Sequence, residues 1–359
     1  MGKKRLTVIL TCLWAAFAIA AVTSAAVAQG LAADMPCGGT TADGWIAACT
    51  AMIESSTLHG RPLAGVYSQR GYAFTLKRNL AQAKKDLDEA IKIDPQFAQA
   101  FVNRANFWTV MHKPDQALAD SETAIRLAPE LPLTYYVHGS ASLNLGRYDR
   151  AVTDYSKALS LSPELGIDLY GLRGLAYHRM GDEDHAIADY DALLKLEPSN
   201  VGVLLNRGDA LRNKKELSRA AADYSEAIRL APNNPGGWKG RGFVRVMTQD
   251  PKGAVADFTE AIRRSPNDRN LYLQRGAAWA FLNENAKALA DYDAAIGIDP
   301  NYPLAYVDRA DALNALGEHA AAKASLKKAL DLAPGFPPAL DVMKKIGADD
   351  EILPTRTRH

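Results

Sequence analysis

The chain has 359 residues, of which 48% are apolar and 8% aromatic, so it is long enough for one or more folded domains. Lys and Arg total 42 against 41 Asp and Glu, and the two signs are interspersed along the sequence. This balance argues against nucleic acid or an anionic membrane surface as the main partner, because both require a basic surface.

The first 28 residues have the pattern of an export signal. Lys3-Lys4-Arg5 precede an apolar run over residues 6–21, and residues 26–28 are the small residues Ala-Val-Ala that favour cleavage by a signal peptidase. An uncleaved membrane anchor is the alternative, because the apolar run approaches the length that spans a bilayer. Both interpretations place the rest of the chain outside the cytoplasm, in the periplasm or secreted.

Residues 29–63 are predicted to form an N-terminal capping segment. Without residues 1–28 the chain keeps two cysteines, Cys37 and Cys49, and an even pair in an exported protein predicts a disulfide. A two-thiol metal or redox site is the alternative, but the pair lacks a close Cys-x-x-Cys spacing and lacks His or Cys companions. The segment from Trp45 to Ile53 is predicted to be a lone helix, which the bridge would hold against the first repeat.

A repeated pattern organises the chain from residue 64 to residue 334. A proline recurs at intervals of 34 residues, with one interval of 35, at Pro95, Pro129, Pro163, Pro198, Pro232, Pro266, Pro300 and Pro334. Twelve residues before each proline lies an alanine: Ala83, Ala117, Ala151, Ala186, Ala220, Ala254, Ala288 and Ala322. Self-similarity at a fixed period indicates a repeat architecture.

The spacing within each unit predicts two antiparallel helices. In the second helix, Ala254, Phe258 and Ala261 follow one another at four- and three-residue steps, so they share one face. The proline behind them cannot continue the helix and marks its end. In the first helix a glycine, such as Gly242 or Gly276, allows the paired helix to approach closely. Three units also have a glycine at the turn, where a left-handed residue ends the first helix: Gly146, Gly181 and Gly317.

Residues 64–334 resemble tetratricopeptide repeats of an exported bacterial type. The family pattern places a large residue, a glycine and an aromatic on the first helix, and Ala, aromatic, Ala and Pro on the second. The resemblance implies an all-α fold, a right-handed α-solenoid of eight helical hairpins with N- and C-terminal capping helices. Residues 335–348 are predicted to be the C-terminal capping helix, and residues 349–359 a disordered tail.

Two charged slots recur in the predicted hairpins. An Arg precedes the glycine slot of the first helix, and an Asp precedes the aromatic of the second. The pairs are Arg70 with Asp86, Arg104 with Asp120, Arg173 with Asp189, Arg207 with Asp223, Arg241 with Asp257 and Arg275 with Asp291. Antiparallel helices bring these slots near each other, and a guanidinium suits a carboxylate, which favours a structural ladder. A row of Arg donors that binds carboxylates on a partner is the alternative.

By the same resemblance, the first helices line a concave groove that binds a partner. The predicted contact residues run from polar and aromatic to mainly apolar: Tyr72, Asn106, Tyr136, Lys239, Phe243, Val246, Leu273, Leu304 and Val307. The apolar ones have no core role in the family pattern, and contiguous exposed apolar surface typically marks a binding site. Packing between neighbouring first helices is the alternative.

The sequence therefore predicts an exported scaffold that holds a segment of another protein, in a role such as cell-envelope assembly. It contains no phosphate-binding loop, nucleophile elbow or zinc-type His-Glu pair, and the repeats use nearly all of the mature chain. We expect no catalytic residue, no cofactor, no metal and no nucleic acid, and no membrane contact unless the N-terminal segment stays uncleaved. A non-catalytic accessory subunit and a self-associating envelope structural protein are the alternatives.

Overall fold

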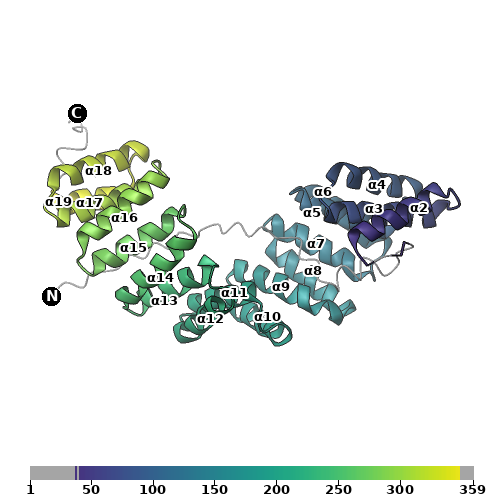
Figure 1. Cartoon of the computed structure of the whole chain (residues 1–359), viewed down its shortest axis with the longest axis horizontal. Helices are drawn as coiled ribbons and strands as arrows, with labels where there is room; N and C mark the ends of the chain where they lie inside the picture. Colours follow the sequence, from purple (N-terminus) through teal and green to yellow (C-terminus); the bar gives the residue numbers. More distant parts are fainter. Residues whose placement is uncertain (1–36, 39, 348–359) are drawn as a thin grey trace, which may run out of the picture. The chain divides into compact units, whose positions relative to one another are not determined.

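The computed structural model describes residues 37, 38 and 40–347 (Figure 1). The predicted signal peptide and the predicted tail, residues 349–359, lie outside the described residues. The described part consists of eighteen α-helices and one short 3-10 helix, without a strand. None of these helices combines the length and the apolarity that a membrane span requires. The chain divides into two compact units, one up to Arg173 and one from Gly174, and each is described by itself.

The first unit begins with a lone helix, and three hairpins follow (Figure 1). Its helices are α2 (Ala42–Glu54), α3 (Gly60–Leu76), α4 (Leu80–Ile93), α5 (Ala98–Val110), α6 (Pro114–Leu127), α7 (Pro132–Asn144) and α8 (Tyr148–Leu161), followed by η1 (Pro163–Leu165). The two helices of each hairpin pack along their length, as in α3 with α4. Helix α9 (Gly166–Met180) contains the boundary between the units.

The second unit continues the same arrangement and ends with a single helix. Its helices after α9 are α10 (Glu183–Leu196), α11 (Val201–Asn213), α12 (Leu217–Leu230), α13 (Pro235–Met247), α14 (Pro251–Arg264), α15 (Arg269–Phe281), α16 (Asn285–Ile298), α17 (Pro303–Ala315), α18 (His319–Leu332) and α19 (Pro337–Ile346). Consecutive helices pack as hairpins, and each hairpin packs on the next within the unit. The predicted all-α architecture of helical hairpins is confirmed.

The helices begin and end at residues whose chemistry explains the boundary. Helix α4 ends at Ile93 and α14 ends at Arg264, each two residues before a proline of the repeat. Three first helices of the second unit follow a residue whose side chain accepts a hydrogen bond from a backbone N–H of the first turn: Asn200, Asn234 and Asp268. The hairpin frame is therefore set by local sequence.

A residue with positive φ follows the first helix in every hairpin. Gly146, Gly181 and Gly317, which were expected there, have φ values of 71°, 81° and 83°. In the other five hairpins the same turn is made by residues with a Cβ: Arg78, His112, Lys215, Gln249 and Asn283. Because this conformation is strained for such residues, the packing of the two helices imposes the turn where glycine is absent.

The glycine slot on the first helix is required by an aromatic ring on the second. A Cβ added to Gly242 would lie 2.7 Å from Cε1 of Phe258, and one added to Gly276 would lie 2.6 Å from Cε1 of Tyr292. Both rings are buried in the hairpin core. The predicted close approach of the paired helices is therefore present at these positions.

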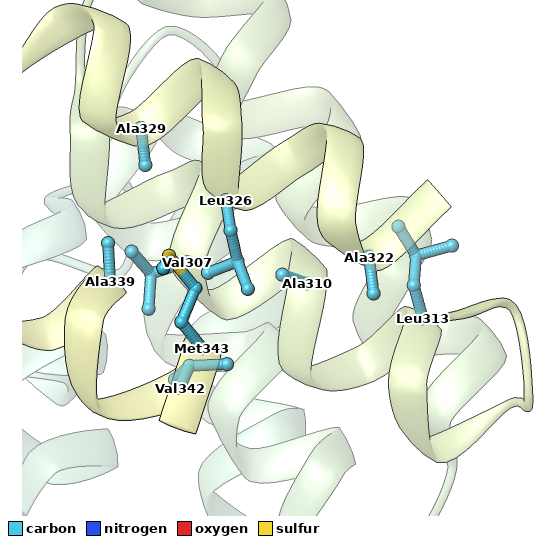
Figure 2. Packing of buried hydrophobic residues seen from close by; sticks show 9 residues of the cluster. All are labelled: Val307, Ala310, Leu313, Ala322, Leu326, Ala329, Ala339, Val342 and Met343. Atoms are coloured by element: carbon cyan, nitrogen blue, oxygen red, sulfur yellow. The ribbon is translucent and has the colours of Figure 1, made fainter. Parts of the chain in front are cut away.

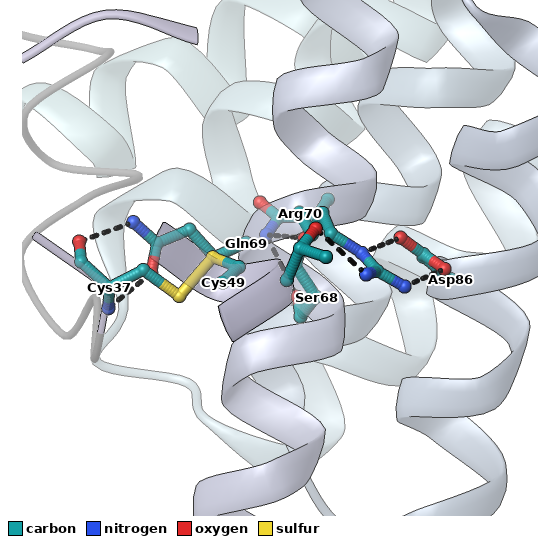
Figure 3. Close-up of a disulfide and its surroundings, with 8 residues drawn as sticks. Cys37, Cys49, Ser68, Gln69, Arg70 and Asp86 are labelled. Atoms are coloured by element: carbon teal, nitrogen blue, oxygen red, sulfur yellow. Dashed lines mark hydrogen bonds and ion pairs between the residues drawn. A yellow bond between two sulfur atoms is a disulfide. The ribbon is translucent and has the colours of Figure 1, made fainter. Parts of the chain in front are cut away.

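Helix α2 closes the start of the first unit (Figure 3). The structure joins Cys37 to Cys49 of α2 as a disulfide, with their Cα atoms 5.2 Å apart. Both cysteines are buried against Val66 of α3. The side-chain amide of Gln69 accepts a hydrogen bond from the N–H of Cys37 at 2.9 Å and donates to its carbonyl at 3.1 Å. Helix α3 begins at Gly60, inside the segment that the sequence assigned to the cap, so the first hairpin is longer than expected.

Helix α19 closes the end of the second unit by apolar packing (Figure 2). Val342 and Met343 of α19 are buried against Val307 of α17 and Leu326 of α18. Burying a side chain of this size contributes about 1.5–3 kcal/mol. The helix lies within the predicted capping segment and stops at Gly347, whose φ is 66°.

Candidate partner-binding faces

The charged slots of the predicted ladder meet inside individual hairpins. In the second unit, Nε and Nη2 of Arg207 donate to the two carboxylate oxygens of Asp223, at 2.8 and 2.6 Å. The same two-point contact joins Arg70 to Asp86, Arg104 to Asp120, Arg241 to Asp257 and Arg275 to Asp291. Of the sixth predicted pair, Arg173 lies in the first unit, where it donates to Ser156, and Asp189 is buried in the second unit.

The third nitrogen of the same guanidinium groups contacts the preceding repeat or, for Arg70, the cap helix α2. Nη1 of Arg104 donates to Asp88 at 2.9 Å, and Nη1 of Arg207 donates to Asp191 at 2.6 Å. In three other hairpins the acceptor is a hydroxyl: Thr50 for Arg70, Ser225 for Arg241 and Thr259 for Arg275. This second contact was not foreseen, although its signal, a polar residue two positions after each ladder Asp, is present in the sequence. The guanidinium groups lie against the protein's own acceptors, which favours a structural ladder over a row of donors for a partner.

The first face comprises inner slots of α3, α5 and α7 together with the start of α9, and its residues are Tyr72, Asn106, Tyr136, Ser140 and Asp168. Tyr72 was expected to contact a partner, but its side chain is fully buried. The reason is the cap, because the ring of Trp45 on α2 lies with its centroid 6.3 Å from that of Tyr72. Tyr72 is therefore a core residue, and the expectation of an exposed ring was wrong.

Hydrogen-bonding groups dominate the rest of the first face. Burial, followed by the nearby Asp168 and Tyr72, raises the pKa of Tyr136, so its hydroxyl stays neutral. Ser140 accepts a hydrogen bond from the hydroxyl of Tyr155 at 3.2 Å. Asn106 is 8% exposed, and its Nδ2 is a buried donor without a hydrogen-bond partner in the described part of the chain. Such a donor gains a bond if a carbonyl approaches it.

The second face comprises inner slots of α11, α13 and α17, and its residues are Asp209, Arg212, Lys239, Phe243, Val246, Leu304, Asp308 and Asp311. Phe243, Val246 and Leu304 are half-buried: one side packs on the core and the other remains accessible. The ring of Phe243 meets that of Phe258 edge-on, with centroids 5.5 Å apart. A row of apolar side chains therefore stays partly open to solvent in the second unit.

Two residues expected on this face belong to the core instead. Leu273 is 5% exposed and Val307 is 3% exposed. Leu273 packs with Tyr292 and with Ala305 of the next hairpin, whereas Val307 packs against α19. Packing between neighbouring first helices is thus the correct interpretation at Leu273, which packs on α17, whereas Val307 is covered by α18 and the cap α19.

The α11–α13 part of the second face carries a net positive charge. Nη2 of Arg212 lies 3.1 Å from Asp209, which also accepts a hydrogen bond from the hydroxyl of Tyr224 at 2.7 Å. The guanidinium carbon of Arg212 lies 5.4 Å from the ring centroid of Phe243. Lys239 is half-buried and forms no ion pair with another described residue. One cation in this part thus remains without a carboxylate.

The α17 part of the second face is acidic. Burial, followed by Asp311, raises the pKa of Asp308 to about 7. Asp311 itself pairs with Nζ of Lys345 on α19 at 2.8 Å. Asp308 was missed in the sequence, although it lies three residues before Asp311 and therefore on the same side of the helix. The described residues contain no group of three His, Cys, Asp or Glu side chains that could hold a metal ion.

The comparisons with known proteins agree on the repeat. Family models of the tetratricopeptide repeat match residues 64–97, 133–165, 172–235, 246–303 and 304–336, which is more than half of the chain. No curated protein has a sequence significantly similar to this one.

Similar solved structures show the same fold. A tetratricopeptide repeat protein from Parabacteroides merdae is 21% identical, with a TM-score of 0.55 over 70% of this chain and 98% of that one. The C-terminal part of a repeat-containing protein from Cytophaga hutchinsonii is 18% identical, with a TM-score of 0.56 over 67% and 98%. The pilF protein of Pseudomonas aeruginosa is 21% identical, with a TM-score of 0.52 over 60% and 96%. The chain belongs to the tetratricopeptide repeat family.

Proposed function

We propose that this protein is an exported, non-catalytic scaffold that binds a segment of a partner protein along its second face. The observation that carries the proposal is the set of half-buried side chains Phe243, Val246 and Leu304, which share the second face with the unpaired Lys239 and the acidic Asp308. Apolar groups bordered by charged groups are typical of protein-binding surfaces. The near-neutral charge of the chain gives no support for a nucleic-acid partner.

The ladder explains why the face can be open without loss of fold. The guanidinium groups that hold the hairpins together already have acceptors within the protein, as in Arg241 with Asp257. The ladder therefore joins the two helices of a hairpin independently of the solvent-exposed side of the second face. A partner that covers it adds apolar burial worth roughly 25 cal/mol for each Å² removed from water.

Export is part of the same proposal, and we place the role in the cell envelope. The N-terminal pattern of residues 1–28 supports it, and a Cys37–Cys49 disulfide is typical of an oxidising compartment. Mass spectrometry of the protein from the cells that produce it tests this point. We expect a mature chain that starts at Gln29 outside the cytoplasm, whereas a membrane-bound chain that keeps residues 1–28 would indicate the anchor.

Site-specific crosslinking tests partner binding. A photoreactive phenylalanine analogue at Val246 should capture a partner in intact cells, and Phe243→Asp and Lys239→Glu should each reduce capture about tenfold, equivalent to 1.4 kcal/mol. Leu196→Asp is the matched control, because Leu196 is 55% exposed on α10 and lies outside the second face. Capture that is equal in all three variants, with unchanged melting temperatures, would contradict the proposal.

A further inference from the structure

The second face has a charge polarity that its occupant must match. Its α11–α13 part carries one surplus positive charge, because Asp209 offsets Arg212 while Lys239 is unpaired. Its α17 part carries one surplus negative charge when all its carboxylates are ionised, because Asp311 pairs with Lys345 while Asp308 forms no ion pair with another described residue. The complementary segment therefore has acidic residues at one end, apolar residues in the middle and basic residues at the other end.

The distance between the charged ends sets the length of that segment. Lys239 on α13 and Asp308 on α17 are two hairpins apart, with α15 between them. Helices α13 and α15 share an apolar cluster, and α15 contacts α17. Packed helices lie about 8–10 Å apart, so the two charges are roughly 20 Å apart. An extended chain rises about 3.3 Å per residue, so about six residues must separate the acidic group from the basic group.

The protein's own C-terminal sequence has this pattern. Residues 349–351 are Asp-Asp-Glu, residues 352–354 are Ile-Leu-Pro, and Arg356 and Arg358 follow. Asp350 and Arg356 are six residues apart, which is the separation that the second face requires. Pro354 also favours an extended conformation for the residue before it.

The direction of the chain decides which copy supplies the segment. Glu351 follows Gly347 by four residues, which reach at most about 14 Å, so the acidic residues of the same copy cannot reach Lys239. Laid along its own copy, the segment would place its acidic end at Asp308 and its arginines toward Lys239, and like charges would repel at both ends. A segment that arrives from a second copy can run in the opposite direction, with opposite charges facing each other.

We propose that residues 349–358 of one copy bind the second face of another copy, with the acidic residues at Lys239 and the arginines at Asp308 and Asp311. This inference rests on the proposed function and names the occupant of the face. An arginine beside Asp308 favours its ionised form, so binding weakens as the pH falls below about 7, where Asp308 is protonated. Asp311 and Tyr292 are the other titratable groups that interact with this carboxyl, and Lys345 pairs with Asp311.

A charge exchange in the full-length protein tests the inference. A fluorescein-labelled peptide of residues 348–359 should bind the wild-type protein, and Lys239→Glu should weaken binding about tenfold or more. A peptide in which residues 349–351 are lysines should bind the Lys239→Glu variant better than it binds the wild type. The controls are a peptide with the same residues in scrambled order and the variant Lys195→Glu, an exposed charge change on α10 outside the face.

Sedimentation velocity measures the same contact between complete chains. The wild type should associate as its concentration rises, Lys239→Glu should remain monomeric, and a chain with residues 349–351 changed to lysine should associate only when mixed with Lys239→Glu. Equal binding of the native and scrambled peptides, together with association unchanged by Lys239→Glu, would overturn the inference. If crosslinking at Val246 still captures another protein that depends on Phe243, the proposed function stands and only self-association is overturned.

Discussion

The two units place different chemistry in equivalent slots of their first helices. In the first unit, Tyr72, Asn106 and Ser140 are buried among the unit's own groups. In the second unit, Phe243 and Leu304 are half-buried, and Lys239 has no carboxylate partner among the described residues. A shared hairpin frame therefore does not decide by itself which slots form a surface. Whether a slot is exposed depends on how completely the neighbouring helix covers it.

The caps of the two units differ in the same way. The first unit is closed by a disulfide and by the two hydrogen bonds of Gln69 to Cys37. The second unit is closed by apolar side chains of α19, such as Met343, packed on α17 and α18. The first cap thus combines apolar contacts with a covalent link, whereas the second cap packs without a disulfide.

Removal of a ladder arginine should have the largest effect and should affect both units alike. Arg104→Ala leaves Asp120 without its cation, and Arg207→Ala does the same to Asp223, so each should lower the free energy of unfolding by about 3 kcal/mol. Urea denaturation measures this, with Lys239→Ala as a control within about 0.5 kcal/mol of the wild type. A large loss in one unit only would show that the two ladders are not equivalent.

Reduction of the disulfide should destabilise the first unit alone. The bridge closes a loop between residues 12 positions apart, which predicts a loss of about 2–3 kcal/mol. Hydrogen exchange with and without reductant should show faster exchange in α2 and α3 and no change in α15 to α19. Cys37→Ser is the control, since reductant should not alter it. If the wild type shows two free thiols from these cysteines before reduction, the disulfide does not form.

Asp308→Asn should stabilise the second unit near pH 8 and have little effect near pH 4. The folded state raises the pKa of Asp308 from 3.8 to about 7, so it favours the protonated carboxyl. That contribution is fully present below about pH 4 and is lost as the pH rises through 7. The amide of asparagine does not ionise, so the substitution removes the free-energy cost of holding an ionised carboxylate in the folded state. For a half-buried group this should raise the free energy of unfolding by about 1–3 kcal/mol. Thermal unfolding measures this, with Asp341→Asn on α19 as an exposed control.

Asn106→Leu should stabilise the first unit by about 1 kcal/mol, because it removes a buried donor without a partner. Val246→Asn, the reverse kind of change on the second face, should cost less than a fully buried substitution, because Val246 is half-buried. Thermal unfolding of both variants compares the two faces directly. A destabilised Asn106→Leu chain would indicate that Nδ2 has a partner in solution.

Substituting glycine for the positive-φ residue between the two helices of a hairpin should give the smallest gain in stability, and the gain should be equal in both units. Arg78 in the first unit and Gln249 in the second have φ values of 59°, which is unfavourable for a residue with a Cβ. Arg78→Gly and Gln249→Gly should each stabilise by about 0.5–1 kcal/mol, as differential scanning calorimetry can measure. Gly317→Ala at the equivalent turn is the opposite change and should destabilise. Two gains that differ widely would mean that the turns are not equally strained.

The fold was predictable from the sequence to the level of individual helices, because its signals are local. The prolines of the repeat mark helix ends such as Ile93, and the spacing of Ala254, Phe258 and Ala261 defines a helix face. The slots of Arg207 and Asp223 could also be placed near each other, since both lie within one hairpin. Interactions inside a repeat depend on a fixed local spacing, and one sequence is enough to read it.

Only the tertiary structure decided which of these slots are open. Leu273 and Val307 are buried because the next hairpin or the cap covers them, and Tyr72 is buried behind α2. The raised pKa of Asp308 has the same origin, since burial is its main cause. Burial depends on the position and size of side chains on a neighbouring element, and a repeat pattern that specifies one hairpin does not contain that information.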